Sequence, residues 1–334
     1  MRHFHFRLQR LRKYIEAPVG SAVFKMWLRG LPITLNIVNI IYRGKDPPLY
    51  KIIIEMILIA DSGATKAAWC LVGGKRKLEV KTQGISPYYF TSEQVTHVLL
   101  QELAPSIKGK AIDEIHFYGT GCATAAMQQV VKKGIKNAFP KAGKISVASD
   151  MMGAARALCG TSKGVVCILG TGSNSCVYNG KRITKNNPAP GFILGDEGSG
   201  AYLGRKVLQH FIYNTFDEEL MHRFNLKYKT DYRTILDHVY KQPWPNRYMA
   251  GFTTFLSENR GHYMIENILE DGLSDFFMTH LYKYTETWSS PINFVGSIAW
   301  HFRDKLQEIC ASFELQLGKI LQAPIDGLAD FHKK

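Results

Sequence analysis

The chain has 334 residues, a net charge of +14 and a hydrophobic fraction of 46%, which fits a soluble globular enzyme of about two domains. The positive charge would normally indicate nucleic acid or an acidic membrane as a partner. However, residues 1–55 hold ten Lys and Arg residues against three acidic ones, which is half of the excess. Because the rest is only mildly basic, we expect neither partner.

Residues 1–55 do not resemble the start of a globular domain. The apolar run "GLPITLNIVNIIY" has 13 residues, whereas a helix needs about 20 to span a bilayer. The basic start "MRHFHFRLQRLRK" resembles a targeting peptide, but no cleavage site follows in the usual order. Met56 directly precedes the first convincing strand, so we expect residues 1–55 to be an extension outside the fold. A targeting or membrane-surface segment is the alternative.

The cysteines favour a reducing compartment. All six lie singly in apolar runs and none forms a CxxC pair, so we expect small buried apolar side chains rather than disulfides or a zinc site. The expected location is the cytoplasm.

From Met56 onward, short apolar runs alternate with amphipathic stretches. Strands are expected at 57–61, 67–72, 77–82, 113–121 and 144–150, with helices at 91–107, 124–139 and 151–160. Beyond Ser199 the chain is expected to be largely helical for about 90 residues. It should then close with a strand at 292–297, a helix at 300–313 and a short tail.

An internal repeat links two parts of the chain. "VVCILGTGSNSCVYNGKRI" (165–183) aligns with "ILIADSGATKAAWCLVGGKRK" (57–77) and places Gly172 over Gly63. Each copy is an apolar strand, a small hydroxylic turn with glycine, a second strand and a Gly-Lys-Arg turn. Either this is a chance likeness of two hairpins, or the chain contains two copies of a β-β-β-α domain that face each other.

The two repeated turns are candidate phosphate loops. Backbone N–H groups of a tight glycine turn can converge on an anion, and Ser or Thr hydroxyls add donors without bulk. Asp61, at the end of its strand, suits a hydrated Mg²⁺, whereas the Lys that follows is either a phosphate partner or a solvated surface side chain. The candidate phosphate-binding residues are Ser62, Gly63, Ala64, Thr65 and Lys66 in the first turn, and Gly170, Thr171, Gly172 and Ser173 in the second.

Three motifs together resemble a known superfamily. "DSGATK" looks like the first phosphate loop, and "LGTGSNS" like the second, of the sugar kinase, actin and heat-shock chaperone ATPases. "LGDEGSGAYLG" (194–204) narrows the resemblance to the N-acetylglucosamine kinase branch of the BadF/BadG/BcrA/BcrD ATPase group. It covers the chain from Met56 almost to its end.

The resemblance implies an α/β fold with two ribonuclease-H-like (actin-like ATPase) domains around a central cleft. These would be an N-terminal domain at 56–160, and a C-terminal domain at 161–330 that is enlarged by helices. ATP with Mg²⁺ would lie in the cleft, which closes over the sugar. A metal-phosphate site at the strand end would also explain why that strand ends on Asp61, held to the metal through water.

Phosphoryl transfer to a hydroxyl needs a group that accepts the proton. Asp150 matches the position of the family's catalytic aspartate in its "TDA" or "SDA" motif, and we expect it to be the base; the alternative is a helix N-cap. Asp196 and Glu197 would lie near sugar and phosphates, or one of them would cap the helix near Ser199.

The remaining site residues also come from the resemblance. Gly84 and Ser86 fall in the sugar loop, with Tyr88 and Tyr89 bordering the ring, and Thr120 and Gly121 fall near the substrate. Gly296 and Ser297 match the adenosine loop, or form an ordinary strand-to-helix turn. Family members often have Asn where this chain has Ser86, which leaves the sugar's identity open.

The expected function is ATP-dependent phosphorylation of an amino sugar, most simply N-acetylglucosamine to its 6-phosphate. The chain lacks GxxxxGK[ST], GxGxxG and HExxH, so P-loop, dinucleotide and zincin functions lose their main support. Two alternatives stay open: a BadF-type ATPase that activates a dehydratase, which needs an iron–sulfur cluster between subunits, and a non-enzymatic sugar sensor or nucleic-acid-binding protein. The preferred hexosamine and the oligomeric state, a homodimer included, also stay open.

Overall fold

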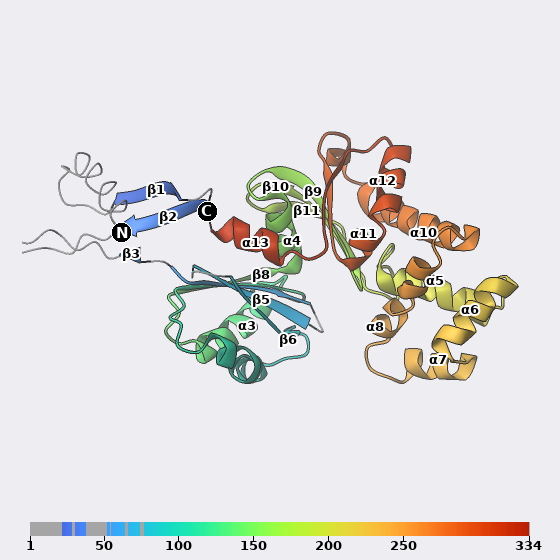
Figure 1. The fold of residues 1–334 in the computed structure, drawn as a ribbon, viewed down its shortest axis with the longest axis horizontal. Coiled ribbons are helices and arrows are strands. Elements are labelled where there is room, and N and C mark those ends of the chain that lie inside the picture. Colours follow the sequence, from blue (N-terminus) through green and yellow to red (C-terminus); the bar gives the residue numbers. More distant parts are fainter. Residues whose placement is uncertain are drawn as a thin grey trace, which may run out of the picture.

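The structure, a computed structural model, describes residues 22–28, 31–37, 52–53, 55–63, 66–73 and 77–333. Most of the expected extension therefore lies outside the described residues. Its three described strands form an antiparallel sheet of their own, drawn apart from the rest in Figure 1. These strands are β1 (Ala22–Leu28), β2 (Leu31–Ile37) and β3 (Ile52–Ile53).

Two further sheets of five strands each form the body of the molecule. The first contains β4 (Ile57–Ser62), β5 (Lys66–Val72), β6 (Leu78–Gln83), β7 (Glu114–Gly119) and β8 (Lys144–Ser149). The second contains β9 (Lys163–Leu169), β10 (Ser173–Asn179), β11 (Ile183–Asn186), β12 (Ile292–Val295) and β13 (Leu317–Leu321).

The helices fall into three groups along the chain. With the first sheet are α2 (Ser92–Val98), α3 (Ala125–Ala138) and α4 (Asp150–Cys159). The long insertion contains α5 (Gly200–Ile212), α6 (Glu218–Tyr228), α7 (Tyr232–Tyr240), α8 (Pro245–Ala250), α9 (Thr253–Glu258) and α10 (Tyr263–Phe276). The last are α11 (Ser297–His301), α12 (Arg303–Ser312) and α13 (Ile325–His332).

Shorter turns extend some of these helices. There are π-helical turns at Leu99–Leu103 and Phe277–Leu281, and 3₁₀ turns at Ala104–Ile107 and Thr285–Trp288. Among the described residues, no helix is both long enough and apolar enough to cross a membrane.

The two sheets have the same topology. Their orders are β6-β5-β4-β7-β8 and β11-β10-β9-β12-β13, with the first three strands antiparallel and the last three parallel in each. β9 therefore corresponds to β4, and each is followed by the repeated glycine turn. This confirms the duplication that the sequence repeat indicated and excludes a chance likeness of hairpins.

Helix α4 connects the two sheets and packs against both. Its residues Met151, Ala155 and Leu158 form a cluster with the second sheet, while Met152 and Ala157 pack in the cluster that covers the first sheet. Figure 1 shows α4 between the two sheets, with α13 beside it. The first residue of α4, Asp150, consequently lies where the two halves of the molecule meet.

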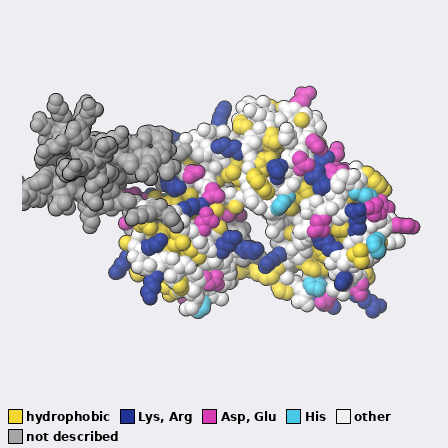
Figure 2. Space-filling view, viewed as in Figure 1, with side chains coloured by type: hydrophobic (Ala, Val, Ile, Leu, Met, Phe, Trp, Pro, Cys, Tyr) yellow, Lys and Arg dark blue, Asp and Glu magenta, His cyan; other side chains and the backbone are white. Residues whose placement is uncertain are grey.

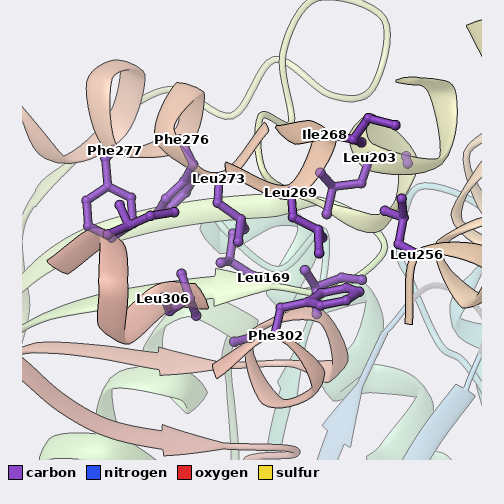
Figure 3. Close-up of a cluster of buried hydrophobic side chains, with 14 of the residues drawn as sticks. Leu169, Leu203, Leu256, Ile268, Leu269, Leu273, Phe276, Phe277, Phe302 and Leu306 are labelled. Carbon is purple, nitrogen blue, oxygen red and sulfur yellow. The ribbon is translucent and has the colours of Figure 1, made fainter. Parts of the chain in front are cut away.

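Side chains of the insertion helices pack on the second sheet. Figure 3 shows Leu203 from α5, Leu269 and Leu273 from α10, and Phe302 around Leu169, the last residue of β9. All of these side chains are buried. The hydrophobic core thus fixes the strand end from which the second glycine turn leaves.

The local signals for helices and cysteines are confirmed. Thr91 and Gln94 form a capping box at α2, and Gly160, with a φ of 60°, ends α4. Five of the six cysteines are buried and Cys159 is partly buried. Burial raises the pKa of every one of these thiols, to about 12 for Cys310 and about 11 for Cys159, so they remain neutral apolar side chains.

The C-terminal end of the chain differs from its prediction. The expected helix over 300–313 is interrupted at Phe302, and the expected short tail contains β13 and α13. Strand β13 is a short edge strand, and α13 is amphipathic over only about two turns, so both signals are weak in the sequence. Helix α13 returns to the first sheet, where Ile325, Leu328 and Ala329 join its core.

Docking of α13 is expected to stabilise the fold, because the side chain of Leu328 is fully buried. Leu328→Ala should lower the free energy of unfolding in urea by about 3 kcal/mol. Leu226→Ala, at a site that is 62% exposed, is the matched control and should change it by less than about 0.5 kcal/mol. Equal unfolding midpoints for Leu328→Ala and wild type would contradict the docking.

Candidate active site

Two carboxylates lie at one edge of the first sheet. Asp61 is near the carboxyl end of β4, and Asp150 directly follows β8, whose carboxyl end lies at the same edge because the two strands run parallel to β7 between them. Burial, followed by repulsion from Asp150, raises the pKa of Asp61 to about 7. Burial likewise raises the pKa of Asp150.

Asp150 is not the N-cap of α4. Ser149 takes that position, and its hydroxyl accepts a hydrogen bond from the amide of Met152. The Asp150 carboxylate accepts the Met151 amide at 2.7 Å, and the Thr120 side chain also favours its charged form. Since another residue caps the helix, the alternative explanation for Asp150 is excluded.

The first glycine turn is coupled to the predicted sugar loop. The Ser62 hydroxyl is fully buried, accepts the amide of Ile85 at 2.8 Å and donates to the Ile85 carbonyl. The Gly63 amide donates to the carbonyl of Lys66, whose side chain is exposed. Ser62 therefore fixes the loop that follows β6. Ala64 and Thr65 lie outside the described residues.

The sugar-loop candidates come together below this turn. Gly84 and Ser86 are buried, and the Thr120 amide donates to the carbonyl of Ser62. A Cβ at Gly121 would lie 2.9 Å from the Ser86 hydroxyl oxygen, so the two loops are in contact.

The second glycine turn is held by Asp196. The Ser173 amide donates to the Asp196 carboxylate at 3.3 Å, and a Cβ at Gly172 would lie 2.9 Å from the same carboxylate, which requires glycine there. The carbonyls of Gly170 and Thr171 accept the first amides of α5. Burial raises the pKa of Asp196, and nearby Glu197 adds to this. Ser199 caps α5, so neither acid is the cap.

Gly296 and Ser297 lie at the same edge of the second sheet as the second turn. Gly296 has a φ of 128°, and a Cβ on it would lie 2.1 Å from the Leu169 carbonyl oxygen. Only glycine allows the loop after β12 to approach the end of β9 in this way. Ser297 is exposed at the start of α11.

Buried polar atoms without a hydrogen-bond partner concentrate in these loops. Among the described residues there are six such side-chain atoms, and four belong to the loops or to their immediate support: Ser86, Ser173, Glu197 and His280. A buried polar atom without a partner costs free energy, and each one therefore indicates a place for a ligand or water. Figure 2 also shows Lys and Arg side chains gathered where the lower-left and right bodies meet.

One aromatic pair at this site has no signal in the sequence. Tyr89, in the sugar loop, meets Trp244, just before α8, with ring centroids 5.1 Å apart and an edge-to-face angle of 73°. Tyr89 belongs to the first half of the chain and Trp244 to the helical insertion of the second. The pair therefore joins the two halves away from α4, and only the tertiary fold could reveal it.

The carboxylate oxygens of Asp61 and Asp150 suit a hard divalent cation. Two carboxylates that repel each other would be relieved by Mg²⁺, which prefers oxygen ligands and keeps several waters. Among the described residues no group of three His, Cys, Asp or Glu side chains could hold a metal by itself.

Known proteins resemble this chain in structure. No family model and no curated protein matches it. A Porphyromonas gingivalis protein named "Putative N-acetylglucosamine Kinase" is 38% identical, with a TM-score of 0.80 over 83% of this chain and 99% of its own. A Chromobacterium violaceum protein of the same name is 16% identical, with a TM-score of 0.65 over 83% and 99%. MreB5 of Spiroplasma citri, bound to ADP, is 10% identical, with a TM-score of 0.53 over 84% and 95%.

The duplicated sheets and these neighbours define a protein with the two-domain actin-like ATPase fold. At 38% identity over almost all of the P. gingivalis protein, the chain belongs to the same family as that protein, the N-acetylglucosamine kinase-like family.

Asp61, which is partly buried and has a raised pKa, makes stability depend on pH. In the unfolded chain this group is ionised at both pH 5 and pH 8, but in the folded chain it loses its proton only near pH 7. The stability that the protonated Asp61 side chain gives to the folded state is therefore present at low pH and is lost as the pH rises through 7. The comparison is made without Mg²⁺, on the unfolding free energy of Asp61→Asn minus that of wild type. This difference should rise by about 1–3 kcal/mol from pH 5 to pH 8. The exposed Asp330→Asn should show no such gain, and a flat difference for Asp61→Asn would refute the assignment.

The Tyr89–Trp244 contact should be measurable as a coupling energy. In a double-mutant cycle, Tyr89→Ala and Trp244→Ala should couple by about 0.5–1.5 kcal/mol in unfolding free energy. Tyr88→Ala is the control, since its ring lies against Gly121 and should not couple to Trp244. Additive losses for the Tyr89 pair would mean that the contact does not hold the two halves together.

Proposed function

We propose that this protein is an ATP-dependent sugar kinase whose phosphoryl acceptor is an amino sugar, with N-acetylglucosamine as the preferred one. The observation that carries the proposal is the pair of partly buried carboxylates with raised pKa values, Asp61 and Asp150, at the edge where the first glycine turn leaves β4. Membership of the family of the P. gingivalis protein supports it, and so does that protein's name. We also propose, from the motif at 194–204, that this family belongs to the BadF/BadG/BcrA/BcrD group.

The two glycine turns are proposed to hold the nucleotide. Backbone amides of residues 62–66 and 170–173 would bind phosphates, together with the unpartnered hydroxyl of Ser173. The Ser62 hydroxyl is already bonded to Ile85 and would support the turn instead. The loop at Gly296 and Ser297 would lie against the adenosine. The close approach of Gly296 to the end of β9 supports this, since it leaves a loop without side-chain bulk beside the second turn.

Mg²⁺ fits beside Asp61, held through water. When bound with ATP, it would neutralise charge that develops on the transferred phosphoryl group. The rise in the pKa of Asp61 supports this role, because a buried carboxylate next to another carboxylate binds a cation favourably.

Asp150 is proposed to accept the proton of the sugar hydroxyl. Its carboxylate lies at the start of a buried helix, and the raised pKa makes it a better proton acceptor than an exposed aspartate. Gly84, Ser86, Thr120, Gly121, Asp196 and Glu197 would bind the sugar. The unpartnered Ser86 hydroxyl supports that assignment, since a sugar hydroxyl would satisfy it.

The dehydratase-activator alternative is less well supported. An iron–sulfur cluster shared between subunits needs thiolates at the surface. Here no cysteine is exposed, and burial raises the pKa of each thiol.

The proposal is tested by measuring ATP consumption by the full-length protein with Mg²⁺ and a panel of N-acetylglucosamine, glucosamine, N-acetylmannosamine and glucose. We expect preference for N-acetylglucosamine. Asp150→Asn should lower kcat by about 10²–10⁴ while the KM for ATP stays close to wild type. Asp330→Asn is the control and should behave as wild type. Unchanged turnover in Asp150→Asn would remove this residue from the mechanism, and no response to any sugar would refute the kinase.

A further inference from the structure

His280 is a buried histidine that the proposed mechanism does not use. It lies on the π-helical turn after α10 and is 1% exposed. Its Nε2 atom faces Oε2 of Glu197 at 3.5 Å, and both atoms are buried without a hydrogen-bond partner. The ring of Phe276 stacks on the imidazole at 4.7 Å, which fixes the plane of the ring.

A chain of hydrogen bonds reaches His280 from the other side. The amide of Asn187 can only donate, so the Tyr284 hydroxyl accepts it at 2.7 Å. The same hydroxyl lies 3.1 Å from both the carbonyl and the hydroxyl oxygen of Ser175. The Ser175 hydroxyl lies 3.3 Å from Nδ1 of His280. Ser175 belongs to β10, close to the second glycine turn.

The Glu197 carboxylate beside Nε2 decides the imidazole tautomer. Burial lowers the pKa of His280, although Glu197 opposes the shift, and the neutral ring carries one proton. If that proton were on Nδ1, the lone pair of Nε2 would point at a buried carboxylate oxygen, which is repulsive. The proton therefore lies on Nε2, aimed at Glu197, and this leaves Nδ1 able to accept from the Ser175 hydroxyl.

Resting on the proposed function, we propose that His280 is a positioning residue for the sugar site: it donates its Nε2 proton to Glu197 and holds the other carboxylate oxygen toward the acceptor sugar. A sugar hydroxyl that donates a hydrogen bond to Glu197 would then meet a carboxylate oxygen whose position is already fixed. The present separation of 3.5 Å is longer than a hydrogen bond, and a small shift of Glu197 on sugar binding would close it.

Substitution of His280 by Asn or by Gln tests the roles of its two ring nitrogens separately. The amide nitrogen of Gln can replace Nε2, whereas that of Asn reaches only the position of Nδ1. His280→Asn should raise the KM for N-acetylglucosamine about tenfold, with kcat within about threefold and the KM for ATP within about twofold. His280→Gln should keep all three values within about threefold of wild type. His222→Asn, on the exposed face of α6, is the matched control.

A Glu197→Gln background tests whether His280 acts through Glu197. There, His280→Asn should add less than about twofold to the KM for the sugar. Equal losses in His280→Asn and His280→Gln, or a full tenfold loss in the Glu197→Gln background, would overturn the inference and leave a purely structural histidine. If wild type shows no sugar-dependent ATP consumption, the proposed function fails and the inference falls with it. If wild type is active and His280→Asn has a normal KM, the inference alone fails.

Discussion

The packing of α4 between two sheets is the interaction on which the rest of the structure depends. One face of the helix contributes to the core of the first sheet and another to the core of the second. Because α4 follows β8 directly, its N-terminus lies at the edge where β4 also ends. This places Asp150 at the meeting point of the two halves, and α13 adds a second apolar contact on the same side.

Burial at this point has an electrostatic consequence. Carboxylates placed in a desolvated region hold their protons more strongly, and Asp61 and Asp150 also repel each other. The fold therefore maintains a pair of acids with raised pKa values next to the first glycine turn. Such a pair adds little to the stability of the fold, and acids with perturbed pKa values concentrate at functional sites, which is why we propose a cation and a phosphoryl group as its ligands.

Much of the fold was predictable because its signals are local. The alternation of apolar residues, the capping Thr91 and the terminating Gly160 each act within a few residues, and the repeat at 57–77 and 165–183 indicated the duplication. Strand β13 and helix α13 were missed, since their short segments owe their structure to the sheets that they join.

The candidate site likewise contains residues with a local signal in the sequence and residues without one. Motifs in the sequence pointed to Asp61, Asp150 and the glycine turns. The contacts of Trp244 with Tyr89 and of His280 with Glu197 depend instead on how the helical insertion packs. A lone histidine in "FMTHLY" carries no signal of its own. Likewise, the sequence offered Asp150, Asp196 and Glu197 as possible caps, and only the structure showed that Ser149 and Ser199 fill those positions.

The most direct test of the central claim is a phosphorus NMR spectrum of the full-length protein's reaction with ATP, Mg²⁺ and N-acetylglucosamine. Transfer to the 6-hydroxyl next to Asp150 predicts a new phosphomonoester signal that couples to the two protons on carbon 6. A signal coupled to a single sugar proton would place the transfer at another hydroxyl. Inorganic phosphate alone would contradict the account, because it would show ATP hydrolysis without transfer to the sugar.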